Sequence, residues 1–182
     1  MHALQAARGT TLSKQSNPGL LRVVMGVALV VVLADQLAKW VVVTYREDQS
    51  PIAVIGDWVQ LAVVRNSGAA FGLGASATVI FSLIAIGVAV VVVRQSRTLT
   101  SKAWAFALGA LLGGAVGNVI DRLTRSPGFG RGAVVDFVDV KYFSVFNIAD
   151  AALTLAAISI AILAVRGVPM SSKEQSGPYS IS

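Results

Sequence analysis

Long apolar runs alternate with short polar segments along most of the chain. Each run is close to the roughly 20 residues that an α-helix needs to cross a bilayer. The first is too long for a cleavable signal peptide and lacks a small-residue cleavage site, so we expect it to be retained as a helix. The pattern therefore predicts four membrane-spanning helices, at Leu20–Val43, Ala75–Val93, Ala103–Ile120 and Ile148–Val165.

Two of the connections between these runs have the pattern of β-strands. Ile52–Val64 is rich in β-branched residues on either side of the turn-like Gly56-Asp57, which predicts a short hairpin on the membrane surface. Thr124–Phe146 contains a Ser-Pro-Gly turn followed by the strand-like GAVVDFVDV. The expected fold class is an all-α membrane protein of four transmembrane helices with a small extracytoplasmic β-element.

No internal repeat is evident, so one compact membrane domain is the simplest organisation. We assign residues 20–166 to this four-span domain. The polar ends, residues 1–19 and 167–182, are expected to be disordered cytoplasmic tails.

The composition indicates lipid as the main solvent. Of the 182 residues, 55% are hydrophobic and 13% charged, whereas soluble domains carry about 25% charged residues. The net charge is +6, but the basic residues lie mainly at the termini and between apolar runs, where they suit anionic lipid better than nucleic acid. More of these basic residues lie on the side of the membrane that holds the two termini than on the other side. This distribution predicts that both termini are cytoplasmic.

The residue inventory limits the possible chemistry. The chain has no cysteine, and its one histidine, His2, lies in the polar N-terminal segment. Thiol catalysis, disulfides, zinc sites and Ser-His-Asp triads are therefore excluded. Any catalysis has to use carboxylates or lysines, and we expect neither metal nor cofactor.

Charged side chains inside a membrane span are costly and generally mark an interior or a functional site. Asp35 and Lys39 lie four residues apart in the first run, on one helix face where they can neutralise each other. A structural ion pair and a role near the substrate are both open at this point.

The third run combines a packing motif with a polar end. Gly109, Gly113 and Gly117 recur every four residues, which predicts a face on which another helix packs closely. At the end of the run, Asn118, Asp121 and Arg122 share one helix face. The Asp121-Arg122 dipeptide has the simpler interpretation of an interfacial ion pair.

The fourth run begins with Asn147, a plausible N-cap, which would place Asp150 at the third helical position. Capping alone could explain that acid, but the preceding segment also carries Asp136 and Asp139. These two alternate along a strand, so only one of them is expected to face Asp150. The small residues that follow Asn66 form a fourth cluster, and the predicted topology brings all four clusters to one face of the membrane.

Five of these segments together resemble the lipoprotein signal peptidases, also called signal peptidase II. They occur in the order found in that family, within residues 20–166. The segments are Asp35–Lys39, Asn66–Gly72, Gly117–Arg122, Val134–Phe137 and Phe146–Asp150.

The resemblance implies a monomeric aspartyl endopeptidase of the bacterial plasma membrane, with its site at the extracytoplasmic face. Its partners would be membrane lipid and diacylglyceryl-modified prolipoproteins, which it would cut just before the lipidated cysteine. The implied catalytic pair is Asp136 and Asp150, two carboxylates that share one proton, with the identity of the base left open. The implied supporting residues are Asn66, Gly68, Asn118, Arg122, Asn147, Asp35 and Lys39.

Three other readings are possible. A proton-coupled carrier would place polar residues at the membrane midplane, whereas here they gather near one face. A non-catalytic scaffold would use its acids and amides only as helix caps. A metal-dependent hydrolase could bind a hard cation through Asp121, Asp136, Asp139 and Asp150.

Overall fold

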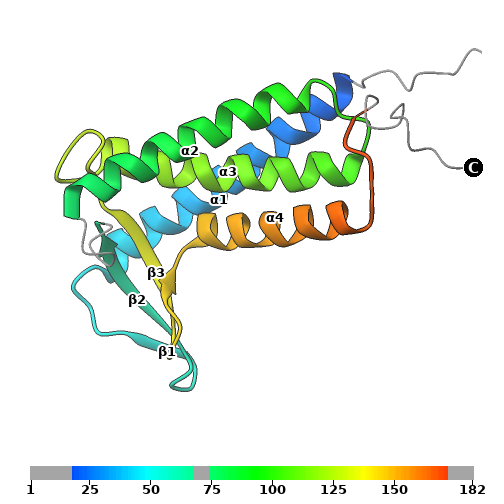
Figure 1. The fold of residues 1–182 in the computed structure, drawn as a ribbon. Helices are drawn as coiled ribbons and strands as arrows, with labels where there is room; N and C mark the ends of the chain where they lie inside the picture. The colour runs from blue at the N-terminus through cyan, green and yellow to red at the C-terminus, as the bar shows by residue number, and fades with distance from the viewer. Residues whose placement is uncertain (1–17, 68–73, 172–182) are drawn as a thin grey trace, which may run out of the picture.

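The protein is a bundle of four helices with a small sheet at one end (Figure 1). The structure is a computed structural model that describes residues 18–67 and 74–171. Each helix lies within a few residues of a predicted apolar run, and α4 has the predicted bounds. The helices are α1 (Pro18–Arg46), α2 (Gly74–Ser96), α3 (Lys102–Thr124) and α4 (Ile148–Val165).

The outward faces of the helices are apolar. Leu29 of α1, Leu83 of α2 and Leu155 of α4 are each about 60% exposed, at 58%, 63% and 63%. In the described part of the chain, α1, α3 and α4 are long and apolar enough to cross a membrane, and α2 contributes a shorter apolar stretch over Ser82–Ser96. Apolar side chains on so many outward faces are expected of helices that lie in lipid.

Helix α3 is the centre of the bundle, and its glycines allow the other helices to approach closely. A Cβ atom added at Gly113 would lie 2.8 Å from the carbonyl oxygen of Ala28 in α1. Gly109 lies equally close to α1, and Gly114 faces Ala149 of α4. The predicted small-residue face is therefore confirmed, and its partner is α1.

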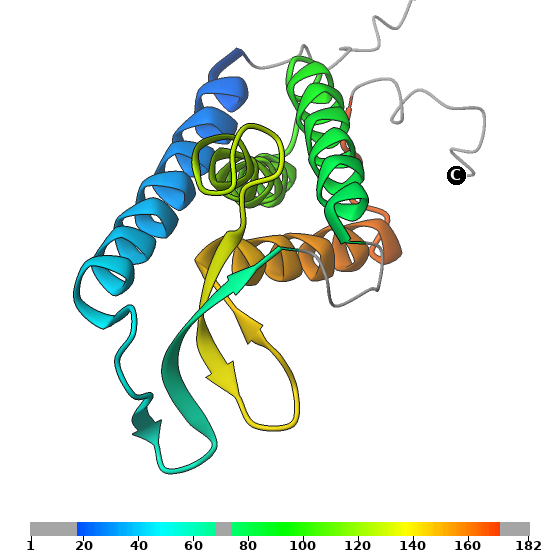
Figure 2. The same cartoon turned by 90° about the vertical axis from the view of Figure 1, so that its left-hand side faces the viewer.

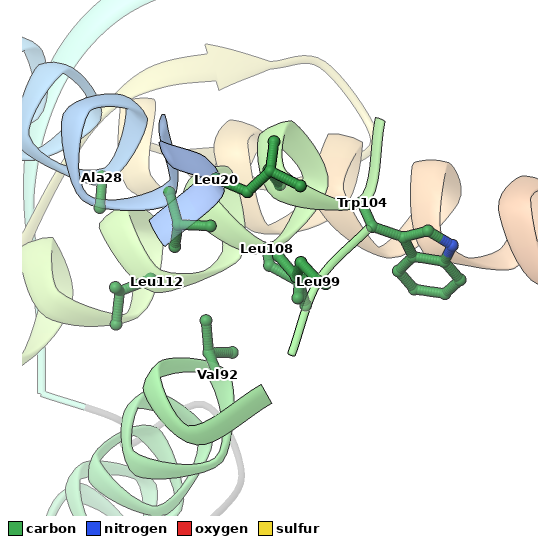
Figure 3. Close-up of a cluster of buried hydrophobic side chains, with 9 residues drawn as sticks. Leu20, Ala28, Val92, Leu99, Trp104, Leu108 and Leu112 are labelled. Carbon is green, nitrogen blue, oxygen red and sulfur yellow. The ribbon is translucent and has the colours of Figure 1, made fainter. Parts of the chain in front are cut away.

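A cluster of buried apolar side chains closes the end of the bundle opposite the sheet (Figure 3). In this cluster Leu99 is fully buried, and Trp104 is 5% exposed. The indole nitrogen of Trp104 donates to the carbonyl oxygen of Val168 at 2.8 Å. This hydrogen bond holds the segment 167–171, part of the predicted C-terminal tail, against α3. The rest of that tail and residues 1–17 lie outside the described residues.

The two strand-like connections form one antiparallel sheet in the order β1-β2-β3-β4. The predicted hairpin is present as β1 and β2, and its second strand pairs with β3, with Asn66 opposite Val134 and Val64 opposite Asp136. Figure 2 shows the sheet extending away from the ends of the helices. The strands are β1 (Ile52–Ile55), β2 (Val59–Asn66), β3 (Val134–Val140) and β4 (Val145–Phe146).

Candidate active site

Asp136 is buried where β3 meets the helix bundle, with 2% of its surface exposed. Asn147 donates its side-chain amide to Oδ1 of Asp136 at 2.6 Å, and Asn66 donates to Oδ2 at 2.9 Å. Burial raises the pKa of Asp136 above its ordinary value, and the nearby charge of Asp150 raises it further, while the two amide hydrogen bonds oppose the shift. The net effect is a carboxyl group that keeps its proton to a higher pH than an exposed aspartate.

Asp150 lies in the first turn of α4, where the N-terminal backbone amides are not bonded within the helix. It forms a capping box with Asn147, whose side-chain oxygen accepts from the Asp150 backbone amide at 2.9 Å. In return, Oδ2 of Asp150 accepts from the Asn147 backbone amide at 3.3 Å. Its other oxygen, Oδ1, accepts from the side chain of Asn118 at 2.8 Å. The predicted cap is present, but it uses only one of the two carboxylate oxygens.

Asn147 joins the two acids. Its side-chain oxygen caps α4 at Asp150, while its side-chain nitrogen holds Asp136. Its backbone amide donates to the Asp150 carboxyl group. Because Asn147 is fully buried, these hydrogen bonds are made with little competition from water, and they hold both carboxyl groups against one residue.

A second polar cluster lies beside this pair. Nζ of Lys39 lies 2.7 Å from Oδ2 of Asp35 and 2.8 Å from Oδ2 of Asp121, and all three side chains are fully buried. Oδ1 of Asp35 accepts from the backbone amide of Ala149 at 2.9 Å. The cluster therefore contains the predicted Asp35–Lys39 pair and ties α1 to α3 and α4.

The predicted ion pair between Asp121 and the adjacent Arg122 is wrong. Asp121 instead pairs with Lys39 and with Arg125, whose Nε lies 2.7 Å from Oδ1. Neighbouring residues on a helix point about 100° apart, whereas residues four apart share a face. Arg125 was not among the predicted site residues, although its spacing of four from Asp121 was a usable signal.

Gln36 was also missed as a member of this cluster. Its side-chain amide donates to Oδ2 of Asp35 at 3.1 Å, to the carbonyl oxygen of Gly117 at 3.1 Å and to Oδ1 of Asp121 at 3.3 Å. The sequence signals for this role were its place beside Asp35 in an apolar run and its position within the Asp35–Lys39 segment.

Asn118 connects the ion cluster to the acid pair. Its side-chain oxygen accepts from Nζ of Lys39 at 3.2 Å and from the amide of Asn147 at 3.3 Å. Since both donors approach that oxygen, the amide nitrogen of Asn118 is directed at Asp150. The ion cluster thus sets the orientation of a side chain that holds one member of the acid pair.

Arg122 is partly buried, and its charge interacts with those of Asp136 and Asp150. With Asn118 it forms the polar part of a cavity of about 290 Å³. The remaining lining is mostly aliphatic and comes from α2, α3 and Leu153 of α4. The cavity therefore places a mostly aliphatic surface next to Asn118 and Arg122.

Asp139 faces away from this site. It lines a separate small cavity with Asp57, Gln60 and Lys141 on the sheet. This confirms the expectation that only one of the two acids in β3 faces Asp150, and that one is Asp136. Gly68 lies outside the described residues.

Comparison with known proteins gives a consistent result. Residues 27–166 match the family model described as signal peptidase (SPase) II. A lipoprotein signal peptidase of Streptomyces coelicolor is 51% identical over 146 residues, which is 80% of this chain and 72% of the relative. One from Mycobacterium tuberculosis is 44% identical over 150 residues, 82% of this chain and 74% of the relative.

Solved structures agree with these sequence matches. One bacterial membrane enzyme superimposes with a TM-score of 0.70 at 30% identity, covering 85% of this chain and 98% of its own. A second has a TM-score of 0.67 at 26% identity, covering 92% of this chain and 98% of its own.

Proposed function

The chain belongs to the signal peptidase II family, and on that premise we propose that Asp136 and Asp150 are its catalytic pair. The protein is a protease that removes signal peptides from prolipoproteins. The observation that supports this pair is the way in which its two carboxyl groups are hydrogen-bonded. Both carboxyl groups accept from the buried residue Asn147, Asp136 from its side-chain amide and Asp150 from its backbone amide, and neither carboxyl belongs to an ion pair in the described part of the chain.

Such a pair suits aspartyl catalysis because two close carboxylates do not both ionise easily. The ionised member takes a proton from a water molecule, whose oxygen attacks the scissile carbonyl carbon. The protonated member donates a hydrogen bond to the carbonyl oxygen, and then its proton, as the tetrahedral intermediate forms. Proton transfer to the amide nitrogen accompanies cleavage of the C–N bond. In this scheme either aspartate can act as the base.

The substrate we propose is a prolipoprotein whose cysteine already carries a diacylglyceryl group, with cleavage just before that cysteine. The largely aliphatic cavity beside Asn118 and Arg122 supports this choice, because acyl chains in such a cavity or in the adjoining lipid would bring the scissile bond to the acids. Binding energy from the lipid then positions a bond remote from it.

We propose a multi-pass arrangement in the bacterial plasma membrane in which all four helices span the bilayer. Both termini would be cytoplasmic, and the acid pair and the sheet would lie at the outer face of a monomer. The chain has no cysteine, so single cysteines at the exposed positions Asp57 and Thr98 test the orientation. An impermeant thiol reagent should label the first and not the second, and the reverse would refute the topology.

The decisive experiment compares two substrates with the purified enzyme in detergent. One is a diacylglyceryl-modified prolipoprotein, and the other is the same chain without lipid. We expect cleavage of the first only, unaffected by a chelator. Equal turnover of both would contradict the lipid requirement, and loss of activity on chelation would favour a metal-dependent hydrolase.

A further inference from the structure

An apolar groove with two arginines at one end runs between α2 and α3, away from the acid pair. It has a volume of about 550 Å³, and its aliphatic lining includes Ala89, Val93 and Val116. Arg94 and Arg97 line the same groove, at the end of α2 that lies opposite the sheet (Figure 1). We propose that this groove binds one anionic glycerophospholipid, with an acyl chain in the apolar part and the phosphate at the two arginines.

The dimensions of the groove fit one leaflet of a bilayer. Along α2 it extends from Ala85 to Arg94 and on to Arg97, and the helical part alone covers roughly 14 Å. The hydrocarbon core of a bilayer is about 30 Å thick, so the acyl chains of one leaflet occupy about half of it. A chain lying along the groove therefore reaches to about mid-membrane while its headgroup stays at the surface.

The charge at the mouth of the groove selects an anion. Arg94 lies in the last turn of α2 and Arg97 in the turn that follows the helix; both line the groove and both are exposed. Neither belongs to an ion pair in the described residues, and the sequence has no acidic residue between Asp57 and Asp121. Guanidinium groups bind phosphate oxygens in a bidentate manner. In a zwitterionic lipid, the cation of the headgroup partly cancels the attraction between the phosphate and the two arginines.

A simpler explanation is that basic residues at helix ends offset the helix dipole or hold a loop at the membrane surface. Arg166 meets that description equally well, since it is exposed at the end of α4. It does not line the groove between α2 and α3. If the groove is a lipid site, Arg94 and Arg97 contribute to lipid binding and Arg166 does not. A general surface effect predicts equal contributions from all three arginines.

Native mass spectrometry of the delipidated full-length protein tests the proposal with two probes, phosphatidylglycerol and phosphatidylcholine. We expect tighter binding of phosphatidylglycerol. The double variant Arg94→Gln/Arg97→Gln should weaken that binding roughly thirtyfold, which corresponds to about 1 kcal/mol for each arginine. Arg166→Gln, the matched control, should leave it unchanged.

Two further variants separate the parts of the site. Arg94→Lys/Arg97→Lys keeps the formal charge, and therefore the membrane orientation, but loses bidentate geometry, so it should give intermediate affinity. Ala89→Phe fills the apolar part and should reduce the binding of both lipids.

Three results would each overturn the site: equal affinity for the two lipids, an Arg166→Gln effect as large as that of the double variant, or unchanged binding in Ala89→Phe. Thermal unfolding without added lipid checks that every variant is folded. No substrate enters these measurements, so their outcome is independent of the catalytic assignment.

Discussion

Two pairs of carboxylates lie side by side at the sheet end of the bundle, and they are held in different ways. Asp35 and Asp121 share the ammonium group of Lys39, at 2.7 and 2.8 Å. Asp136 and Asp150 instead accept from two neutral amide groups of Asn147, Asp136 from the side-chain amide and Asp150 from the backbone amide. Both arrangements satisfy buried polar groups, but only the first supplies a full positive charge.

The difference has a chemical consequence. The ammonium group between Asp35 and Asp121 supplies a counter-charge to both carboxylates, so this cluster acts as a clamp between helices. An amide donates hydrogen bonds without cancelling charge. In the second pair, burial and the nearby charge of Asp150 raise the pKa of Asp136, so that carboxyl keeps its proton to a higher pH than an exposed aspartate. Four changes test this division, from the largest expected effect to the smallest.

Asparagine in place of either member of the amide-held pair should have the largest effect. Asp136→Asn and Asp150→Asn keep size and hydrogen bonding but lose the exchangeable proton, so each should lower the cleavage rate by at least roughly 10³-fold. Because the two act as a unit, the double variant should be scarcely slower than either single one. Initial rates on the lipidated substrate measure this, with thermal unfolding as the control for folding.

Asp139→Asn is the matched control for that experiment. It lies three residues from Asp136 on the same strand but lines a different cavity, so it should retain most of the activity. If Asp139→Asn is folded and inactive while Asp136→Asn cleaves, the catalytic pair is assigned to the wrong acid.

Removal of the cation from the clamp should act on stability first. Lys39→Met leaves Asp35 and Asp121 buried without that counter-charge, a change that typically costs about 3–5 kcal/mol. We expect a large fall in the midpoint of thermal unfolding, with residual activity in whatever fraction stays folded. A variant as stable as the parent but inactive would instead make Lys39 part of the catalytic apparatus.

Asn118 links the clamp to the acid pair, so its loss should have an intermediate effect on rate. Asn118→Ala removes one hydrogen bond to Asp150 and two to its own oxygen. Hydrogen bonds to charged groups contribute about 1.5–3 kcal/mol, so we expect a rate roughly 10- to 100-fold lower. Measuring both kcat and the thermal stability of Asn118→Ala shows whether Asn118 supports the acid pair or the clamp. A loss of stability with unchanged kcat would place Asn118 with the clamp.

The pH dependence should show the smallest effect. Since the pKa of Asp136 is raised, this carboxyl keeps its proton to a higher pH than an exposed aspartate, and activity should fall as the pH rises through the raised pKa. Asn66→Ala removes a hydrogen bond that stabilises the ionised form, so this alkaline limb should move to higher pH. A limb that stays in place or moves to lower pH would contradict the role of Asn66 at Asp136.

The sequence alone determined most of the helical architecture and distinguished the two acids of β3, whereas the predicted catalytic pair came from the family resemblance. Apolar runs of membrane length predict helices because a backbone in lipid has to satisfy its own hydrogen bonds. The glycine spacing in α3 predicted close packing, and strand alternation separated Asp136 from Asp139. These are local rules, which depend only on residue type and on spacing along one element.

Contacts between distant segments were decided by the tertiary structure. The pairing of β2 with β3 brings Asn66 to Asp136, and no local pattern specifies which strands pair. Lys39 bridges two helices that are far apart in sequence, and Asn118 directs its amide at Asp150 only because Lys39 and Asn147 donate to its oxygen. These contacts depend on which buried donors and acceptors meet once the helices have packed, because each buried polar group needs a hydrogen-bond partner in the absence of water.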